Sequence, residues 1–509
     1  MNFPTDGKVE LVFSEAIRPR SAENSLVMRP TRDERPTVKV RRNKVVISFP
    51  DNLADNTTYI LSFGRSIQDY RNNAVENNIQ LAFSTGDYLA SSSISGTVFN
   101  LDPGLLCKIM AWSDNNFIPA SISNIQPDYI TSTDSRGNFN LSNLSKGKYY
   151  LLAVPSKQNI RQISSRDNVA IPNQFPVVLH TDSSNVDQIR FKINNYDLLN
   201  PFSLQSAQME GSYVNCSFSH PVMQTNWDSV SASLSINTPV LKKWRDDNDK
   251  KSVKLLFDNL PVDSTLSISL QGLMNARKQK ISQQFAEVQF RSKGNIDSIG
   301  PALQSSFPPN NEKDVDKNVN PRLNFNEPVY NIDPQTDITL MNSEDSTKFT
   351  CSCRFIDDNT LEIVPGSQLD NNTGYSIVCN SASWIDYFGN SYQDSTFSLK
   401  FTTLDPRQFG YLSGRLDLGV DISYDNIRLK ASRIESEYES ITRADSSGRF
   451  RFDRLFPGQY QISIWLDHDR DNDYDVGNLF PPEAAEDYIV YPEKYEIRAR
   501  WETEQIILK

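Results

Sequence analysis

The sequence predicts an all-β protein built from tandem β-sandwich domains. Three observations support this fold class: two types of internal repeat, alternation of apolar and polar residues within short segments, and turn residues between those segments. The longest candidate helix, residues 482–487, has about one and a half turns, which is too short to be stable alone. Helices are therefore not expected to contribute to the core.

The first repeat occurs three times, and each copy begins with an alternating strand that ends in phenylalanine. These residues are Phe13, Phe218 and Phe325, and an aliphatic residue follows each of them four positions later. Successive side chains of a strand point to opposite faces, so the alternation indicates strands with one buried face. Each copy has about 90 to 110 residues of short strands and turns, which is typical of a β-sandwich.

Two copies share a tyrosine at a matching position. Leu53 and Tyr59 correspond to Leu369 and Tyr375 at a constant offset of 316, whereas the third copy has Leu266 in place of the tyrosine. A tyrosine near the start of a strand can bond through its hydroxyl to the preceding corner. We therefore expect Tyr59 and Tyr375 to be buried at corners, with a plain core aromatic as the alternative.

The second repeat occurs twice, at an offset of 311. The matching pairs are Asp134/Asp445, Gly137/Gly448, Phe139/Phe450, Leu144/Leu455, Gly147/Gly458 and Tyr149/Tyr460. Asp-x-x-Gly forms a tight turn, because the aspartate bonds to the backbone and the glycine accepts a positive φ. The pattern predicts a duplicated small β domain.

Alternation of the two repeats divides the chain into five predicted domains. In order they are a sandwich, a small β domain, two further sandwiches and a second small β domain. Their expected spans are 1–88, 89–196, 197–295, 296–406 and 407–509.

The first sandwich is expected to lack its first strand. Residues 299–311 of the fourth domain form an extended segment that ends in a Pro-Asn turn, and nothing before Phe13 corresponds to it. We therefore expect the full-length protein to carry an upstream strand and a secretion signal. The segment from Met1 to Asp6 has neither the basic nor the apolar part of such a signal.

Composition disfavours several classes of function. The chain has 52 Lys and Arg against 63 Asp and Glu, a net charge of -11, which disfavours nucleic-acid binding. Three histidines leave little for His-based metal or triad chemistry. No apolar run is long enough to span a bilayer, and no phosphate loop, nucleophile elbow or zincin motif is present. The sequence thus predicts no enzyme.

The five cysteines are interpreted as small buried hydrophobic residues. They are Cys107, Cys216, Cys351, Cys353 and Cys379. A disulfide within residues 351–379 is the alternative. Zinc is disfavoured because the ligand spacing is missing.

One segment has a pattern suited to a metal. Acidic residues stand at alternate positions in the predicted loop after the strand 461–465: Asp467, Asp469, Asp471, Asp473 and Asp475. Such carboxylates can surround one Ca²⁺, and Asn472 tolerates the positive φ that the turn needs. His468 is expected to point away. The alternative is a solvated acidic turn without metal.

Two basic segments are interpreted as hairpins. Residues 242–251 mix Lys, Arg and Trp244 with acidic residues, and an exposed hairpin of alternating charge is favoured over a glycan or phosphate surface. Residues 38–47 are expected to form a hairpin with an Arg-Asn turn.

These patterns resemble two known domain families. The strand end at residues 13–16, the Asn-Thr-x-Tyr corner at 56–59 and the close at 83–87 resemble bacterial Ig-like domains of the SbsA surface-protein type. The Ser-Gly-x-Val, Thr-Asp-x-x-Gly-x-Phe and Leu-x-x-Gly-x-Tyr motifs of the small domains resemble carboxypeptidase-regulatory, or transthyretin-like, modules. The fold class is then tandem Ig-like β-sandwiches alternating with small transthyretin-like β-sandwich modules.

The combination resembles Gram-negative Ig-like-domain lipoproteins. That resemblance implies a cell-envelope location, anchored to the outer membrane through a lipid on a segment that this sequence does not contain, and no catalysis. The expected function is a scaffold or spacer, a rod of sandwiches that docks other envelope proteins. The alternative is an adhesin or carbohydrate-binding accessory protein, and a hydrolase is the least favoured.

Overall fold

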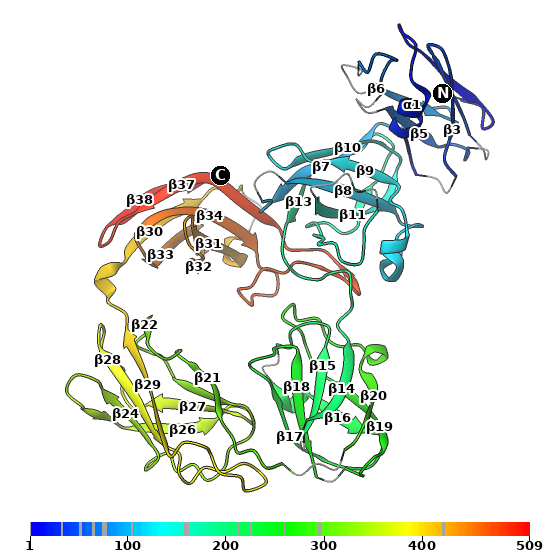
Figure 1. Cartoon of the computed structure of the whole chain (residues 1–509). Coiled ribbons are helices and arrows are strands. Elements are labelled where there is room, and N and C mark those ends of the chain that lie inside the picture. Colours follow the sequence, from blue (N-terminus) through cyan, green and yellow to red (C-terminus); the bar gives the residue numbers. More distant parts are fainter. Residues whose placement is uncertain are drawn as a thin grey trace.

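The fold was analysed in a computed structural model of the chain. It describes residues 2–509 except 32–33, 50–52, 64–66, 74–78, 103–104, 157–159, 161, 211–212, 224–225, 259, 294–296 and 420–422. The described residues form ten sandwich sheets in five successive pairs, and one further two-stranded hairpin. The all-β fold class is confirmed. The five pairs are named the first to fifth domains below (Figure 1).

The first domain packs two three-stranded sheets around one core. One sheet has the order β1 (Lys8–Val12), β4 (Lys44–Ser48), β3 (Thr37–Arg41), and the other β2 (Leu26–Arg29), β5 (Thr58–Phe63), β6 (Ile79–Ser84). The predicted hairpin at 38–47 is confirmed as β3 and β4, with Arg42 at φ 52° in its turn. A short helix, α1 (Pro19–Ser25), was not expected; its Ala22 and Ser25 are buried.

The third and fourth domains are also two-sheet sandwiches. The third has β14 (Leu204–Glu210), β15 (Tyr213–Phe218), β18 (Ser252–Phe257), β17 (Val240–Arg245) against β16 (Ser231–Leu234), β19 (Thr265–Gln271), β20 (Glu287–Arg291). The fourth has β21 (Leu303–Phe307), β23 (Arg322–Phe325), β27 (Thr360–Pro365), β26 (Cys351–Phe355) against β22 (Glu312–Val315), β29 (Thr396–Thr403), β28 (Gly374–Asn380), β24 (Ile338–Asn342), β25 (Lys348–Phe349). In the fourth domain β21 pairs with β23, the strand that ends in Phe325. The corresponding strand of the first domain is β1, which leads to Phe13 and pairs with β4. An upstream strand for the first domain stays a prediction.

The second and fifth domains share one strand order. The second has β10 (Asn138–Leu144), β7 (Ser92–Phe99), β13 (Asn185–Lys192) against β12 (Val177–Leu179), β11 (Gly147–Ser156), β8 (Leu106–Ser113), β9 (Tyr129–Ser132). The fifth has β33 (Arg449–Leu455), β30 (Gly410–Leu416), β38 (Glu502–Leu508) against β37 (Tyr488–Ile497), β34 (Gly458–Leu466), β31 (Ile427–Arg433), β32 (Glu439–Arg443). In each, the last strand runs parallel to the first. The fifth domain adds a small hairpin, β35 (Asn478–Leu479) and β36 (Pro482–Glu483).

Short 3-10 helices fill several connections. They are η1 (Pro119–Asn124), η2 (Trp227–Ser229), η3 (Gln283–Phe285), η4 (Pro406–Gln408) and η5 (Tyr424–Asn426). Among the described residues, no helix is long and apolar enough to cross a membrane.

The predicted tyrosine corners are confirmed. Tyr59 and Tyr375 are buried, and their hydroxyls accept the backbone N–H of Ala54 at 2.9 Å and of Asp370 at 2.8 Å. In the small domains, Tyr149 and Tyr460 donate instead, to the carbonyls four residues before them, at 2.9 Å each. Each corner ties the start of a strand to the turn that precedes it.

Removing one corner hydroxyl should lower stability. Tyr375→Phe is expected to cost about 0.5 to 1.5 kcal/mol, because the backbone N–H of Asp370 loses its acceptor. Urea unfolding of the full chain measures the loss. Tyr387→Phe is the matched control in the same domain, since that ring is 46% exposed. Equal midpoints for the two variants would contradict the corner assignment.

The last four domains contact one another in a closed circuit. The second leads into the third, the third packs on the fourth, the fourth contacts the fifth, and the fifth returns to the second, while the first domain projects beyond the second (Figure 1). The expectation of a rod is therefore wrong for these four domains. The physical reason is a loop of the fifth domain that buries apolar residues against the second.

Candidate functional site at a three-domain junction

The acidic loop begins at a buried ion pair. Strand β34 ends at Leu466, and the next residue, Asp467, is completely buried. Its carboxylate lies 2.8 Å from the guanidinium of Arg428, which is also buried. A buried charge is tolerated when it is paired and hydrogen-bonded. Asp467 therefore has its counter-charge within its own domain.

Asp467 also shapes the loop that follows it. Its two carboxylate oxygens accept the backbone N–H groups of Asp471, at 3.2 Å, and Asn472, at 3.1 Å. Asn472 has φ 73°, as its tolerance for that region predicts, and Arg470 has φ 64°. The sequence reading of a tight loop with a positive-φ asparagine is confirmed.

A lysine from the third domain neutralises the outer carboxylates. The Nζ atom of Lys278 lies 2.9 Å from Asp469 and 3.5 Å from Asp475, and it also contacts Asp471. Burial alone would lower the pKa of Lys278, but the carboxylates of Asp469 and Asp475 outweigh burial and raise it. This contact joins residues that lie about 190 positions apart in the sequence and links the fifth domain to the third.

Glu486 completes the inner side of the loop and was missed from the sequence. Its carboxylate accepts the N–H of His468 at 2.7 Å and of Asp475 at 3.1 Å. Burial, with the nearby carboxylates of Asp475 and Asp467, raises its pKa to about 7. The spacing of acidic residues in the loop could not predict it, because Glu486 follows the hairpin β35–β36 and lies beside the loop only after that hairpin has folded back.

The five aspartates do not converge as one set. Asp467 and Asp469 offer carboxylate oxygens within 4.8 Å of one another and of Glu486. Asp471 and Asp475 share Lys278 with Asp469, whereas Asp473 receives the indole N–H of Trp465 on its backbone carbonyl, at 3.2 Å. The imidazole of His468 is exposed.

The loop also docks the fifth domain onto the second. Val476 and Leu479 join a buried cluster that contains Trp112, Ile171 and Leu199.

Polar contacts flank this apolar patch. Nη1 of Arg190 donates to both carboxylate oxygens of Asp487, at 2.9 and 2.7 Å, and the N–H of Ala485 donates to the carbonyl of Pro172 at 3.0 Å. Apolar burial and a charged pair thus close the circuit together.

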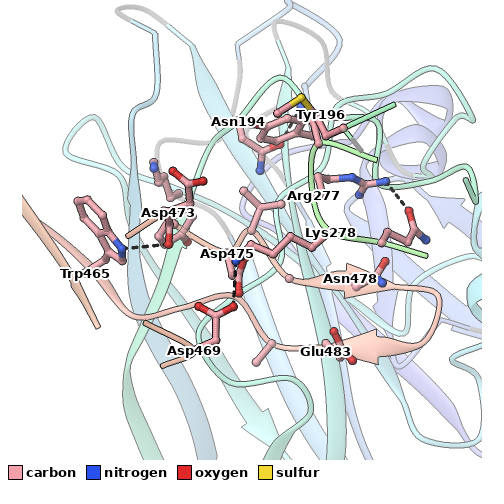
Figure 2. A pocket seen from close by; sticks show the side chains of 18 of the residues that line it. Asn194, Tyr196, Arg277, Lys278, Trp465, Asp469, Asp473, Asp475, Asn478 and Glu483 are labelled. Carbon is pink, nitrogen blue, oxygen red and sulfur yellow. Dashed lines mark hydrogen bonds and ion pairs between the residues drawn. The ribbon is translucent and has the colours of Figure 1, made fainter. Parts of the chain in front are cut away.

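A cavity of about 830 Å³ lies where these three domains meet (Figure 2). The second domain and the segment after it contribute Lys192, Asn194 and Tyr196, and the third contributes Arg277 and Lys278. The fifth domain contributes the acidic loop, the hairpin β35–β36 and residues of β31 and β32. Its volume is within the range of small-molecule sites.

A second carboxylate cluster lies between the third and fourth domains. Asp297, Glu327 and Asp386 offer oxygens within 4.8 Å of one another. The hydroxyl of Tyr213, from the third domain, contacts Glu327, and Asn326 donates to its other oxygen at 3.1 Å. Burial first, then the carboxylates of Asp297 and Asp386, raises the pKa of Glu327 to about 7. No sequence pattern predicted that these residues lie together.

The hairpin predicted at residues 242–251 is confirmed by the antiparallel pairing of β17 with β18. Its strand β17 is not exposed, so that part of the prediction is wrong. Trp244 is completely buried, and its indole N–H donates to the carbonyl of Asn326 at 3.0 Å. Lys242 forms a 2.9 Å salt bridge with Asp358. The fourth domain thus pairs one lysine of the strand, while Arg245 pairs with Asp247 in the same segment.

All five cysteines are free thiols. Cys107, Cys216 and Cys379 are buried in the cores, and burial raises the pKa of Cys107 and Cys379 to about 12. Cys351 and Cys353 are half-buried on β26.

Comparison with known proteins identifies two of the sandwiches. A family model described as bacterial Ig-like domain matches residues 1–85 and 297–403. No curated protein matches the chain. The first and fourth domains of this all-β protein are thus similar to bacterial Ig-like domains.

Solved structures give weaker likenesses. The N-terminal part of the bacterial S-layer protein SbsC is 14% identical, with 34% of this chain and 42% of that chain covered and a TM-score of 0.18. Domains 1–6 of SbsC are 8% identical, with 97% and 66% covered and a TM-score of 0.17. The major pilin subunit BcpA of Bacillus cereus is 8% identical, with 83% and 99% covered and a TM-score of 0.15. These values carry no inference about function.

Proposed function

We propose that the protein is a non-enzymatic scaffold of the bacterial cell envelope that holds other envelope proteins. The observation that carries the proposal is the closed circuit of four domains, in which Lys278 and Arg190 link segments far apart in the sequence. A closed circuit fixes the positions of exposed surfaces, which is what a docking scaffold needs. The match of two segments to bacterial Ig-like domains supports a bacterial setting.

The resemblance to Gram-negative Ig-like lipoproteins adds a location and a domain origin to this proposal. It implies outer-membrane anchoring through a lipid on an upstream segment, and a transthyretin-like origin for the second and fifth domains. The shared strand order of those two domains supports a duplication. Nucleic acid is not an expected partner, given the net charge of -11.

Capture of partners tests the scaffold. The purified chain is immobilised and exposed to detergent-solubilised envelope, alongside a Lys278→Glu/Arg190→Ala variant that breaks two links of the circuit. We expect defined envelope proteins on the wild-type chain and fewer on the variant. An Arg291→Gln variant, altered at an exposed site of the third domain, should match wild type. Equal capture by wild type and by a resin that carries an unrelated protein would contradict the proposal.

Glycan binding is a second candidate function, favoured by one exposed aromatic residue. The side chain of Trp501 is 71% exposed, beside Tyr411, whose N–H donates to the carbonyl of Trp501 at 2.9 Å. Exposed tryptophan rings stack well on flat apolar surfaces. A glycan array with wild type, Trp501→Ala and the control Phe307→Ala tests it. Glycan binding that is unchanged by Trp501→Ala would count against this surface.

Calcium binding by the acidic loop is also proposed, with Lys278 as its competitor. A Ca²⁺ ion at Asp469 would have to displace the ammonium group that now neutralises this carboxylate. Lys278→Ala should therefore raise calcium affinity by roughly fivefold, about 1 kcal/mol for a half-exposed charge. Calorimetric titration of the full chain measures it, with Asp469→Ala as the control that abolishes the heat. Equal affinity of wild type and Lys278→Ala would contradict the competition.

A further inference from the structure

Two residues that line the cavity at the three-domain junction carry hydrogen-bond donors without partners among the described residues. Nε and Nη1 of Arg277 and Nδ2 of Asn194 are buried and have no hydrogen-bond acceptor among the described residues. Nη2 of Arg277 donates to Gln279 at 3.0 Å. Buried donors are nearly always satisfied in folded proteins, and leaving a charged one unpaired is costly.

The cavity also holds unneutralised positive charge. In the described part of the chain, neither Arg277 nor Lys192 has a carboxylate within salt-bridge distance. The Nζ atom of Lys192 instead lies 3.9 Å from the ring centre of Tyr474 and 4.5 Å from that of Tyr488. Burial lowers the pKa of Arg277 to about 10 and that of Lys192 to about 8. The carboxylate of Asp197 acts against this shift at Arg277, and those of Glu439 and Glu486 act against it at Lys192, but they do not offset burial.

The acidic wall does not supply this missing charge. Asp469, Asp471 and Asp475 share Lys278, and Asp467 is paired with Arg428. Lys430, on the fifth-domain side of the cavity, is likewise paired with Glu439 at 2.7 Å. Among the described residues, the cations of the cavity without a salt bridge are therefore Lys192, Arg277 and Lys280, on the side formed by the second and third domains. Arg277 and the neighbouring Asn194 are labelled in Figure 2.

The carboxylates of one side of the cavity are neutralised, whereas cations of the other side have no salt bridge. We therefore propose that the cavity binds a small ligand through an oxyanion group, a carboxylate or a phosphate, on Arg277 and Asn194. A guanidinium group presents a planar fork of donors that matches both oxyanions. The amide of Asn194 adds a neutral donor, and Lys192 adds longer-range attraction. This inference goes beyond a scaffolding role, because it assigns a ligand site to the junction that closes the circuit.

Calorimetric titration of the full chain tests the site with four probes at matched ionic strength. They are inorganic phosphate, glucose 6-phosphate, glucuronate and uncharged glucose. We expect at least one of the three oxyanion probes to bind and glucose not to bind. Binding of both phosphate probes assigns a phosphate site, and binding of glucuronate alone assigns a carboxylate site. Absence of heat from all three oxyanions at millimolar concentration overturns the proposal.

Two variants locate the bound group. Arg277→Gln should weaken the oxyanion probe about tenfold or more, because it removes the charged fork. Arg277→Lys keeps the charge and should give a smaller loss. Arg291→Gln, at an exposed arginine of the same domain, should bind as wild type does. Unchanged affinity in both Arg277 variants, with circular dichroism showing folded protein, overturns the assignment.

Discussion

Replacing Asp467 with alanine is expected to destabilise the fifth domain by about 3 to 5 kcal/mol, because the change leaves a buried guanidinium without its counter-charge. Asp467 and Arg428 are 0% and 6% exposed at their side chains and lie 2.8 Å apart. The variant also removes the acceptor for two backbone N–H groups of the loop. Both losses act on the same turn, so docking onto the second domain should weaken as well.

Thermal unfolding and hydrogen exchange of β31 and β34 measure this effect. Asp473→Ala is the matched control in the same loop, since that residue is exposed, and it should change stability by less than about 0.5 kcal/mol. In an Asp467→Ala/Arg428→Met double variant the cost should fall below the sum of the single costs. Equal effects of Asp467→Ala and Asp473→Ala would show that the ion pair does not hold the loop.

Replacing Glu327 with glutamine is expected to stabilise the chain at pH 8 and to have little effect at pH 4.5. The pKa of Glu327 rises from 4.5 to about 7 on folding, so the folded state prefers the neutral acid. Its contribution to stability is complete below pH 4.5 and is lost as pH rises through about 7. Such a shift is worth at most about 3 kcal/mol. Glutamine stays neutral and escapes the loss.

Urea unfolding at pH 4.5, 6, 7 and 8 compares wild type with the variant. Glu486 has a pKa raised to about 7 as well, so both proteins should lose stability over this range. The difference between their curves isolates Glu327, which lies near Asp297 and Asp386 and contacts Tyr213 across the interface. Parallel curves at all four pH values would mean that Glu327 is not held neutral there.

The elements set by local chemistry could be predicted from the sequence. Alternation of apolar and polar residues shows which face of a strand is buried in the core of its own domain. The spacing from Leu369 to Tyr375 predicted a tyrosine hydroxyl at a corner, and the structure has it there. The turn chemistry of Asp134 and Gly137 acts within five residues, so it too is visible in a linear pattern.

Contacts between domains could not be predicted in the same way. The counter-charges of the acidic loop are Lys278, from another domain, and Arg428, almost forty residues earlier. Trp244 lies among charged residues that suggest a solvated turn, but its ring is buried and its indole N–H donates to Asn326 of the next domain. Asp358 of that domain also pairs with Lys242. A single sequence does not show which domains contact one another. The contact between the fifth and second domains forms only when the whole chain is folded.

Zero-length carbodiimide cross-linking of the native protein, read out by mass spectrometry, tests the closed circuit most directly. The reagent joins a lysine to a carboxylate in contact, and Lys278 lies 2.9 Å from Asp469. We expect a peptide that contains Lys278 joined to one from residues 467–475, together with the reference link between Lys430 and Glu439 inside the fifth domain. Recovery of the reference link without any link from Lys278 would contradict the closed arrangement.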